Sequence, residues 1–118
     1  MMNKLLVIDD ENHIRQLYKD YFSRDGYEVV TVASGEEALQ AAGKEKFDLA
    51  ILDIELEETS GLEVLKSFKE KHPNLPIILN SAYSTYKSDF HTWIADAYIV
   101  KSSDLQPLKN KIKEMVSA

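Results

Sequence analysis

Five polar residues of this chain stand where an apolar, β-rich run of sequence ends. Asp9 and Asp10 follow "KLLVI" (4–8), Asp53 closes "FDLAILD" (47–53), Ser81 closes "PIILNS" (76–81) and Lys101 closes "AYIVK" (97–101). In open parallel sheets, ligand sites lie at the carboxyl ends of the strands. If these runs are parallel strands of one sheet, the five side chains meet at one edge and form a candidate site.

Together these side chains favour phosphoryl chemistry. Three carboxylates in one place repel one another, and a hard divalent cation with a preference for oxygen ligands would compensate them. Mg²⁺ is the natural candidate, while Lys101 adds a second positive charge and Ser81 a hydroxyl donor. Such a cradle suits phosphoryl transfer, which depends mainly on positioning and charge neutralisation. Asp53 is the expected covalent acceptor, because it is central among the five.

Each residue alone has a simpler explanation. An acidic pair after a strand usually belongs to a helix N-cap region, and Asp10 or Asn12 could cap the first helix. A lone Lys101 would be a solvated lysine, and a lone Ser81 a loop hydroxyl. Only the joint placement at four strand ends favours a site.

The composition limits the other possibilities. The chain has 118 residues, which predicts one domain spanning 1–118, and it has no cysteine, which excludes disulfides and thiolate metal sites. Its net charge of −6 disfavours direct nucleic-acid binding. No apolar run approaches the ~20 residues of a membrane span, and the N-terminus has no signal-peptide pattern. We therefore expect a cytoplasmic protein that does not enter membranes.

Helical patterns separate the strand-like runs. The expected strands cover 4–8, 27–32, 47–53, 76–81 and 97–101, and the expected helices cover 12–26, 34–46, 60–72 and 105–118, with a short helix between 81 and 96. Ser34 is expected to cap the second helix. This alternation predicts an α/β fold: a doubly wound, flavodoxin-like, five-stranded parallel sheet in the order 2-1-3-4-5, with helices on both faces.

Four ordered motifs make the chain resemble a known family. They are "VIDDEN" (7–12), "LAILDIELEETSGLEVL" (49–65), "PIILNSA" (76–82) and "DAYIVK" (96–101). Each motif is weak by itself, but the ordered set resembles the receiver domain of two-component response regulators over nearly the whole chain.

The resemblance implies a role for each site residue. Asp53 would be the phosphoacceptor in an Mg²⁺-dependent reaction. Asp10, Asp53 and the backbone carbonyl of Glu55 would bind the metal directly, and Asp9 would bind it through water. Lys101 and Ser81 would contact the phosphoryl group.

The resemblance also implies a switch and its partners. Ser81 and Tyr98 match the two switch positions, and Gly61 matches the glycine that begins the third helix. The phosphoryl donor would be a histidine kinase or a histidine phosphotransfer protein. A homodimer could form through the face made by the 81–96 segment, the 97–101 strand and the last helix. The domain would be no enzyme beyond assisting its own phosphorylation and dephosphorylation.

The chain departs from the family pattern at three residues, and its 81–98 segment looks short. Ser102 stands where a cis proline usually follows the lysine, Glu57 stands where a proline is common, and Ile94 replaces a glycine. A cis bond before a residue other than proline costs ~2.5–4 kcal/mol, so we expect a trans Lys101–Ser102 bond. The flexible lysine stem should still reach Asp53. Ser103 should then cap the last helix, with Asp104 in its first turn.

Three other function classes compete. A pseudo-receiver that binds proteins without phosphorylation is disfavoured by the intact Asp10, Asp53 and Lys101, while Ser102 keeps it open. A phosphatase of the haloacid dehalogenase kind needs a D-x-D arrangement after the first strand, which "DDEN" does not supply. A flavodoxin would need a phosphate loop rich in Ser, Thr and Gly after that strand.

Overall fold

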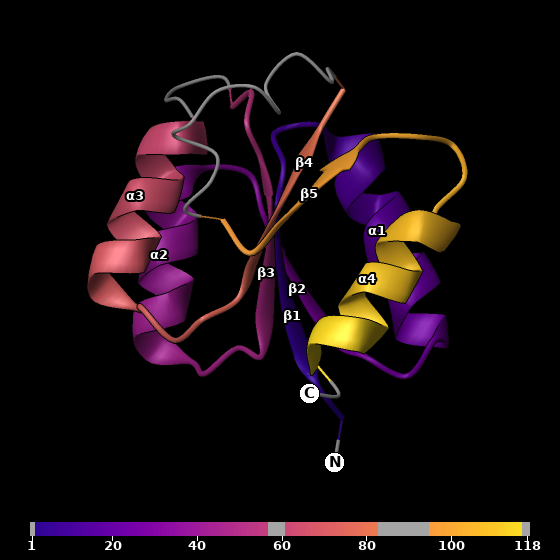
Figure 1. The fold of residues 1–118 in the computed structure, drawn as a ribbon, viewed down its shortest axis with the longest axis horizontal. Coiled ribbons are helices and arrows are strands. Elements are labelled where there is room, and N and C mark those ends of the chain that lie inside the picture. Colours follow the sequence, from indigo (N-terminus) through magenta and orange to yellow (C-terminus); the bar gives the residue numbers. More distant parts are fainter. Residues whose placement is uncertain (1, 57–60, 83–94, 117–118) are drawn as a thin grey trace.

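The fold is a parallel sheet between two layers of helices, as the computed structural model of residues 2–56, 61–82 and 95–116 shows (Figure 1). The strands are β1 (Lys4–Ile8), β2 (Glu28–Val32), β3 (Leu49–Asp53), β4 (Ile77–Ser81) and β5 (Ala97–Val100). All pairings are parallel, and the order is β2-β1-β3-β4-β5. The doubly wound sheet expected from the sequence is confirmed.

The helices divide between the two faces of the sheet. They are α1 (Asn12–Arg24), α2 (Gly35–Lys44), α3 (Gly61–Lys71) and α4 (Gln106–Val116). Helices α1 and α4 cover one face, and α2 and α3 cover the other (Figure 1). The short helix expected between 81 and 96 falls mainly on 83–94, outside the described residues. In the described part of the chain, no helix is long and apolar enough to cross a membrane.

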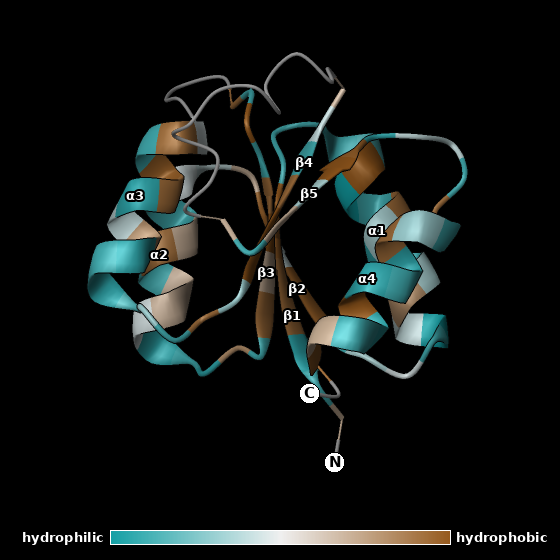
Figure 2. Ribbon diagram, in the orientation of Figure 1, coloured by the Kyte–Doolittle hydropathy of each residue, from teal (hydrophilic) through white to brown (hydrophobic). Residues whose placement is uncertain are grey.

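Successive strand residues pack into two apolar cores, one on each face of the sheet. The strands are largely hydrophobic along their length (Figure 2). Leu49 and Ile51 of β3 pack with Phe22 on the side of α1 and α4. Ala50 and Leu52 pack with residues of α3 on the opposite side. Every residue of β3 and β4 is buried. Burial on both faces explains why these strands are continuous apolar runs instead of alternating ones.

The start of α2 matches the expectation from the sequence. Ser34 is the N-cap, and its side chain accepts a hydrogen bond of 3.2 Å from the backbone N–H of Glu37. The Glu37 carboxylate in turn accepts from the backbone N–H of Ala33 at 3.3 Å. The first bond satisfies a free amide of the first helical turn, and the second ties the residue before the N-cap to the helix.

The start of α1 differs from the expectation. Its N-cap is Glu11, with no side-chain capping bond, so neither Asp10 nor Asn12 is the cap. Instead the Asp9 carboxylate accepts from the backbone N–H of Glu11 at 2.9 Å. The turn before the helix thus uses Asp9, because this carboxylate lies two residues before the free amide.

The connection into α4 is also built differently. The Lys101–Ser102 bond is trans, as expected, since no described residue has a cis peptide bond. Ser103 is not the cap, and Asp104 lies before the helix and not in its first turn. The Ser102 hydroxyl accepts from the N–H of Asp104, and the Asp104 carboxylate accepts from the N–H of Gln106 at 3.0 Å. A carboxylate is the stronger acceptor, so the free amide at the start of α4 bonds to the Asp104 side chain and not to that of Ser103.

Candidate functional site

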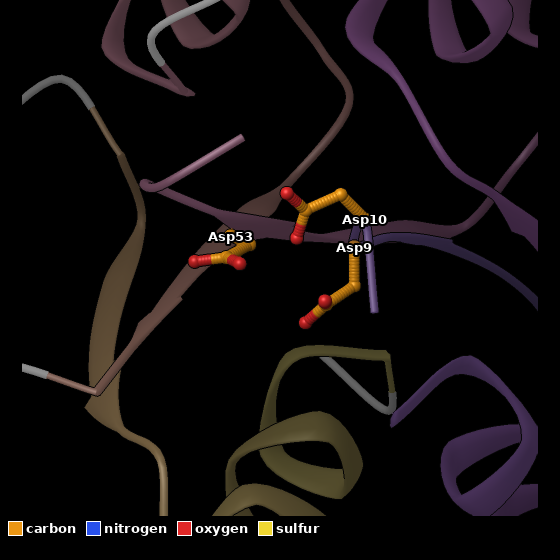
Figure 3. A group of neighbouring side chains, drawn as sticks. All are labelled: Asp9, Asp10 and Asp53. Atoms are coloured by element: carbon orange, nitrogen blue, oxygen red, sulfur yellow. The ribbon is translucent and has the colours of Figure 1, made fainter. Parts of the chain in front are cut away.

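The three acidic residues gather where β1 and β3 end (Figure 3). The two strands are neighbours, with Ile8 beside Leu52, so Asp9 and Asp53 follow side by side. Each of Asp9, Asp10 and Asp53 contributes a carboxylate oxygen to a cluster whose atoms all lie within 4.8 Å of one another. Asp9 and Asp53 are buried, with 2% and 5% of their surface exposed, while Asp10 is half-buried.

Lys101 reaches into this acidic cluster from the end of β5. Its Nζ lies 2.7 Å from Asp9 Oδ2 and 3.2 Å from Asp53 Oδ2. Its backbone N–H donates to the carbonyl of Ser81 at 2.6 Å, which fixes the chain that carries the amine. The predicted contact between Lys101 and Asp53 is confirmed, although Asp9 makes the shorter contact. One ammonium faces three carboxylates, so the cluster keeps an excess of negative charge.

Burial and charge shift the pKa values in the cluster. Burial raises the pKa of Asp53 to about 6, Lys101 opposes this, and the charge of Asp9 adds to it. Burial by itself would lower the pKa of Lys101, but its hydrogen bond to Asp9 and the charges of Asp53 and Asp9 outweigh burial and raise it above its usual range. The lysine is therefore firmly charged, while Asp53 is incompletely compensated.

The chain after Asp53 is held by short backbone contacts. The N–H of Glu55 donates to Asp53 Oδ1 at 3.0 Å, and the N–H of Gly61 donates to the carbonyl of Ile54 at 2.7 Å. A Cβ atom at Gly61 would lie only 2.2 Å from the Asp53 carbonyl oxygen. The close approach of α3 to the end of β3 requires glycine here. This explains why a glycine begins the third helix, as the resemblance implied for Gly61.

The two predicted switch residues lie together. Ser81 is fully buried at the end of β4, and Tyr98 is half-buried on β5. Burial raises the pKa of the Tyr98 hydroxyl, and a hydrogen bond with the Ser81 side chain acts against that rise. Ser81 follows Asn80, whose strand partner is Asp53, so Ser81 lies at the end of β4 that borders the acidic cluster.

Sequence reasoning missed two contacts beside the site. Arg15 of α1 donates from its guanidinium to the backbone carbonyl of Asp9 at 2.7 Å. Asn80 donates from its amide to the hydroxyl of Tyr18 at 2.6 Å, and both side chains are buried. The signal for the second contact was visible: Asn80 is a polar residue inside the buried run "PIILNS".

The family of response regulator receiver domains has a model that matches residues 5–113. The chain belongs to this family. Among solved structures, the response regulator TrrA from Thermotoga maritima, in complex with Mg(2+)-BeF, is 46% identical with a TM-score of 0.93, over 97% of this chain and 99% of that chain. TrrA in complex with the histidine kinase ThkA is 45% identical with a TM-score of 0.92, over 98% of this chain and 99% of that chain.

Curated relatives include two proteins of Bacillus subtilis. The sporulation initiation phosphotransferase F is 38% identical over 84 residues, covering 70% of this chain and 68% of that protein. The alkaline phosphatase synthesis transcriptional regulatory protein PhoP is 42% identical over 82 residues, covering 70% of this chain but 34% of that protein. The chain thus spans about a third of the length of PhoP.

Proposed function

We propose that Asp53 accepts a phosphoryl group in this receiver domain. The observation that carries the proposal is a buried carboxylate at the end of β3 that shares one lysine with a second buried carboxylate. An Asp53 oxygen attacks the phosphorus atom, a new O–P bond forms, and the bond from phosphorus to the donor's leaving group breaks. Lys101 neutralises negative charge beside the transferred group, which is the main requirement of such transfer.

We further propose that the acidic cluster binds Mg²⁺. Its donors are carboxylate oxygens, the ligands that Mg²⁺ prefers, and its charge is only partly compensated by Lys101. Asp10, Asp53 and the backbone carbonyl of Glu55 would hold the ion directly, and Asp9 through water. When bound, Mg²⁺ supplies positive charge for the phosphoryl oxygens. The related TrrA structure, which holds Mg(2+)-BeF, supports this assignment.

A histidine kinase or a histidine phosphotransfer protein is the proposed phosphoryl donor. The complex of TrrA with the histidine kinase ThkA supports a kinase partner. Ser81 and Tyr98 are the proposed switch, because their side chains are hydrogen-bonded and Ser81 follows the strand partner of Asp53. A phosphoryl group on Asp53 would compete for the Ser81 hydroxyl. The pseudo-receiver alternative is less well supported, because Lys101 reaches Asp53 despite Ser102.

Mass spectrometry tests the proposal directly. Incubation with acetyl phosphate and Mg²⁺ should add one phosphoryl group to the parent chain and to Asp20→Asn, a control at an exposed position of α1. Asp53→Asn should gain none, and Asp10→Asn should gain it more slowly. A persistent phosphoryl group on the Asp53→Asn chain would contradict the assignment, and a parent chain that never gains mass would support the pseudo-receiver.

A further inference from the structure

A buried polar pair joins α1 to β4 next to the acidic cluster. The side chains of Tyr18 and Asn80 are each 2% exposed, and the Asn80 amide donates to the Tyr18 hydroxyl at 2.6 Å. Asn80 Oδ1 has no hydrogen-bond partner among the described residues. A buried acceptor without a partner is destabilising, so a plain apolar residue would serve the core better here. The position therefore calls for a reason other than packing.

The sheet register places Asn80 directly beside Asp53. The two residues are partners in the pairing of β3 with β4, and paired residues of parallel strands project to the same face of the sheet. On that face Tyr18 of α1 accepts the Asn80 hydrogen bond. The charges of Lys101, Asp9 and Asp53 all act on the Tyr18 hydroxyl, which places the pair within electrostatic reach of the site.

Short contacts link this pair to the lysine. Asn80 precedes Ser81, whose carbonyl accepts the backbone N–H of Lys101 at 2.6 Å. The same helix that holds Asn80 through Tyr18 also holds Asp9, because Arg15 donates to the Asp9 carbonyl at 2.7 Å. Helix α1 thus fixes both the Asp9 end of β1 and the β4 end that carries the Lys101 backbone. The Lys101 amine spans the space between these fixed points.

We propose that Tyr18 and Asn80 form a positioning pair that sets where the Lys101 amine lies relative to Asp53. The pair touches neither the phosphoryl donor nor the reacting oxygen, so it acts through Lys101. This inference rests on the proposed function of Asp53. Its consequence is that the pair controls the rate of phosphorylation more than it controls folding.

A purely structural hydrogen bond would behave differently from a positioning pair. Replacing both partners of a buried hydrogen bond by apolar groups of similar shape can be nearly neutral for stability, whereas removing one partner leaves the other unsatisfied. The double variant Tyr18→Phe/Asn80→Leu should therefore recover stability that Asn80→Leu loses. If the bond serves only the core, the double variant should also recover the phosphorylation rate.

The test measures phosphorylation rates by mass at saturating acetyl phosphate and Mg²⁺, together with melting temperatures. We expect Tyr18→Phe and the double variant to phosphorylate about fivefold more slowly than the parent, the factor that one typical hydrogen bond is worth. In both variants the new phenylalanine ring should keep the edge contact with Phe22, because the substitution removes only the hydroxyl. In the parent the two ring centroids lie 5.8 Å apart. The matched control is Tyr21→Phe, a half-buried tyrosine of α1 that also packs on Phe22, and it should react at the parent rate.

A second readout does not depend on phosphorylation. The Lys101 ammonium is held by two carboxylates, so its ¹H–¹⁵N signal should be observable by NMR in the parent chain and in Tyr21→Phe. It should shift or broaden in Tyr18→Phe and in the double variant. An unchanged Lys101 signal with a parent-like rate in the double variant would overturn the inference. A parent chain that gains no phosphoryl group would instead overturn the proposed function, whatever the Lys101 signal does.

Discussion

Lys101 is shared unequally between two carboxylates, and this asymmetry defines the chemistry of the site. Its amine is closer to Asp9, at 2.7 Å, than to Asp53, at 3.2 Å. Asp9 also accepts the Glu11 amide, so it is the better satisfied of the two buried acids. Asp53 has one backbone donor and the longer lysine contact. Of the two buried acids, Asp53 is therefore the less compensated.

This imbalance predicts that Asp53→Asn stabilises the metal-free protein. The pKa of Asp53 rises from its ordinary value of 3.8 to about 6, so its ionised form opposes folding once the pH exceeds 6. The rise corresponds to roughly 3 kcal/mol. Below the ordinary pKa the carboxyl is protonated in both the folded and unfolded chain, and its ionisation costs no stability. The gain from Asn should thus be nearly full above pH 6 and should fall to a small fraction of that near pH 4.

Urea unfolding in EDTA, at about pH 7.5 and about pH 4, measures the free energy of unfolding of Asp53→Asn relative to the parent. The dependence of that free energy on urea concentration reports the surface exposed on unfolding and should be the same in both chains. Asp20→Asn, at an exposed position of α1, is the matched control and should change stability little at either pH. A lower free energy of unfolding for Asp53→Asn at the higher pH would show that the Lys101 contact outweighs the burial of the charge.

At the scale of elements, the junction between β3 and α3 controls how Asp53 is presented. A Cβ at Gly61 would lie 2.2 Å from the Asp53 carbonyl oxygen and 2.5 Å from Ile54 Cα. Both are backbone atoms, so no side chain can move aside. We predict that Gly61→Ala costs ~1–3 kcal/mol of stability or more, in line with other overpacked sites. It should also slow phosphorylation, because relief of the clash displaces the backbone of the acceptor.

Gly43→Ala is the matched control for this prediction. Gly43 lies within α2, and a Cβ there would meet nothing within 4 Å. Alanine inside a helix should raise stability by ~0.5–1 kcal/mol relative to glycine. In thermal unfolding, Gly61→Ala should lower the stability and Gly43→Ala should raise it. Only Gly61→Ala should phosphorylate more slowly than the parent. If the two alanine variants behaved alike, the close backbone contact at Gly61 would not be what requires glycine there.

Local signals in the sequence predicted the elements better than the contacts between them. The strands were predictable because a strand that is buried on both faces has a continuous apolar run in its sequence. The Ser34 cap was predictable because Ser34 and Glu37 are only three positions apart. The α4 entry was not, because three neighbouring residues could each supply the acceptor, and the carboxylate of Asp104 took that place.

The candidate site shows the same division. Topology alone brings Asp9, Asp10, Asp53 and Lys101 to one edge of the sheet, and the structure confirms their proximity. Asn80 is recognisable as a polar residue in a buried run, but its partner Tyr18 could not be predicted, because the two residues are 62 positions apart. Periodicity marks which face of a helix is buried, but it does not say which polar atom lies opposite.

At the scale of the whole molecule, the acidic cluster couples metal binding to folding. On unfolding, Asp53 separates from Asp9 and Asp10, so the unfolded chain has no comparable site for a divalent cation. The whole chain is also acidic, with a net charge of −6. General screening by salt and specific binding of Mg²⁺ must therefore be distinguished by measurement.

We predict that Mg²⁺ raises the melting temperature of the parent chain in a saturable way. At 100 times its dissociation constant, an ion that binds only the folded state adds about 2.7 kcal/mol, which corresponds to roughly 10 °C for a domain of this size. Asp10→Asn should lose most of this increase, because Asp10 is a proposed ligand of the ion and makes none of the contacts that hold Lys101.

Two controls isolate the specific effect. Sodium chloride at matched ionic strength reports screening, and Glu36→Gln removes an acid of α2 that lies outside the cluster. Glu36→Gln should keep the full response to Mg²⁺, and EDTA should reverse that response in both the parent and this control. If Asp10→Asn responded to Mg²⁺ as strongly as the parent, the ion would be acting elsewhere on the acidic surface. The three carboxylates would then need another explanation for lying so close together in the folded chain.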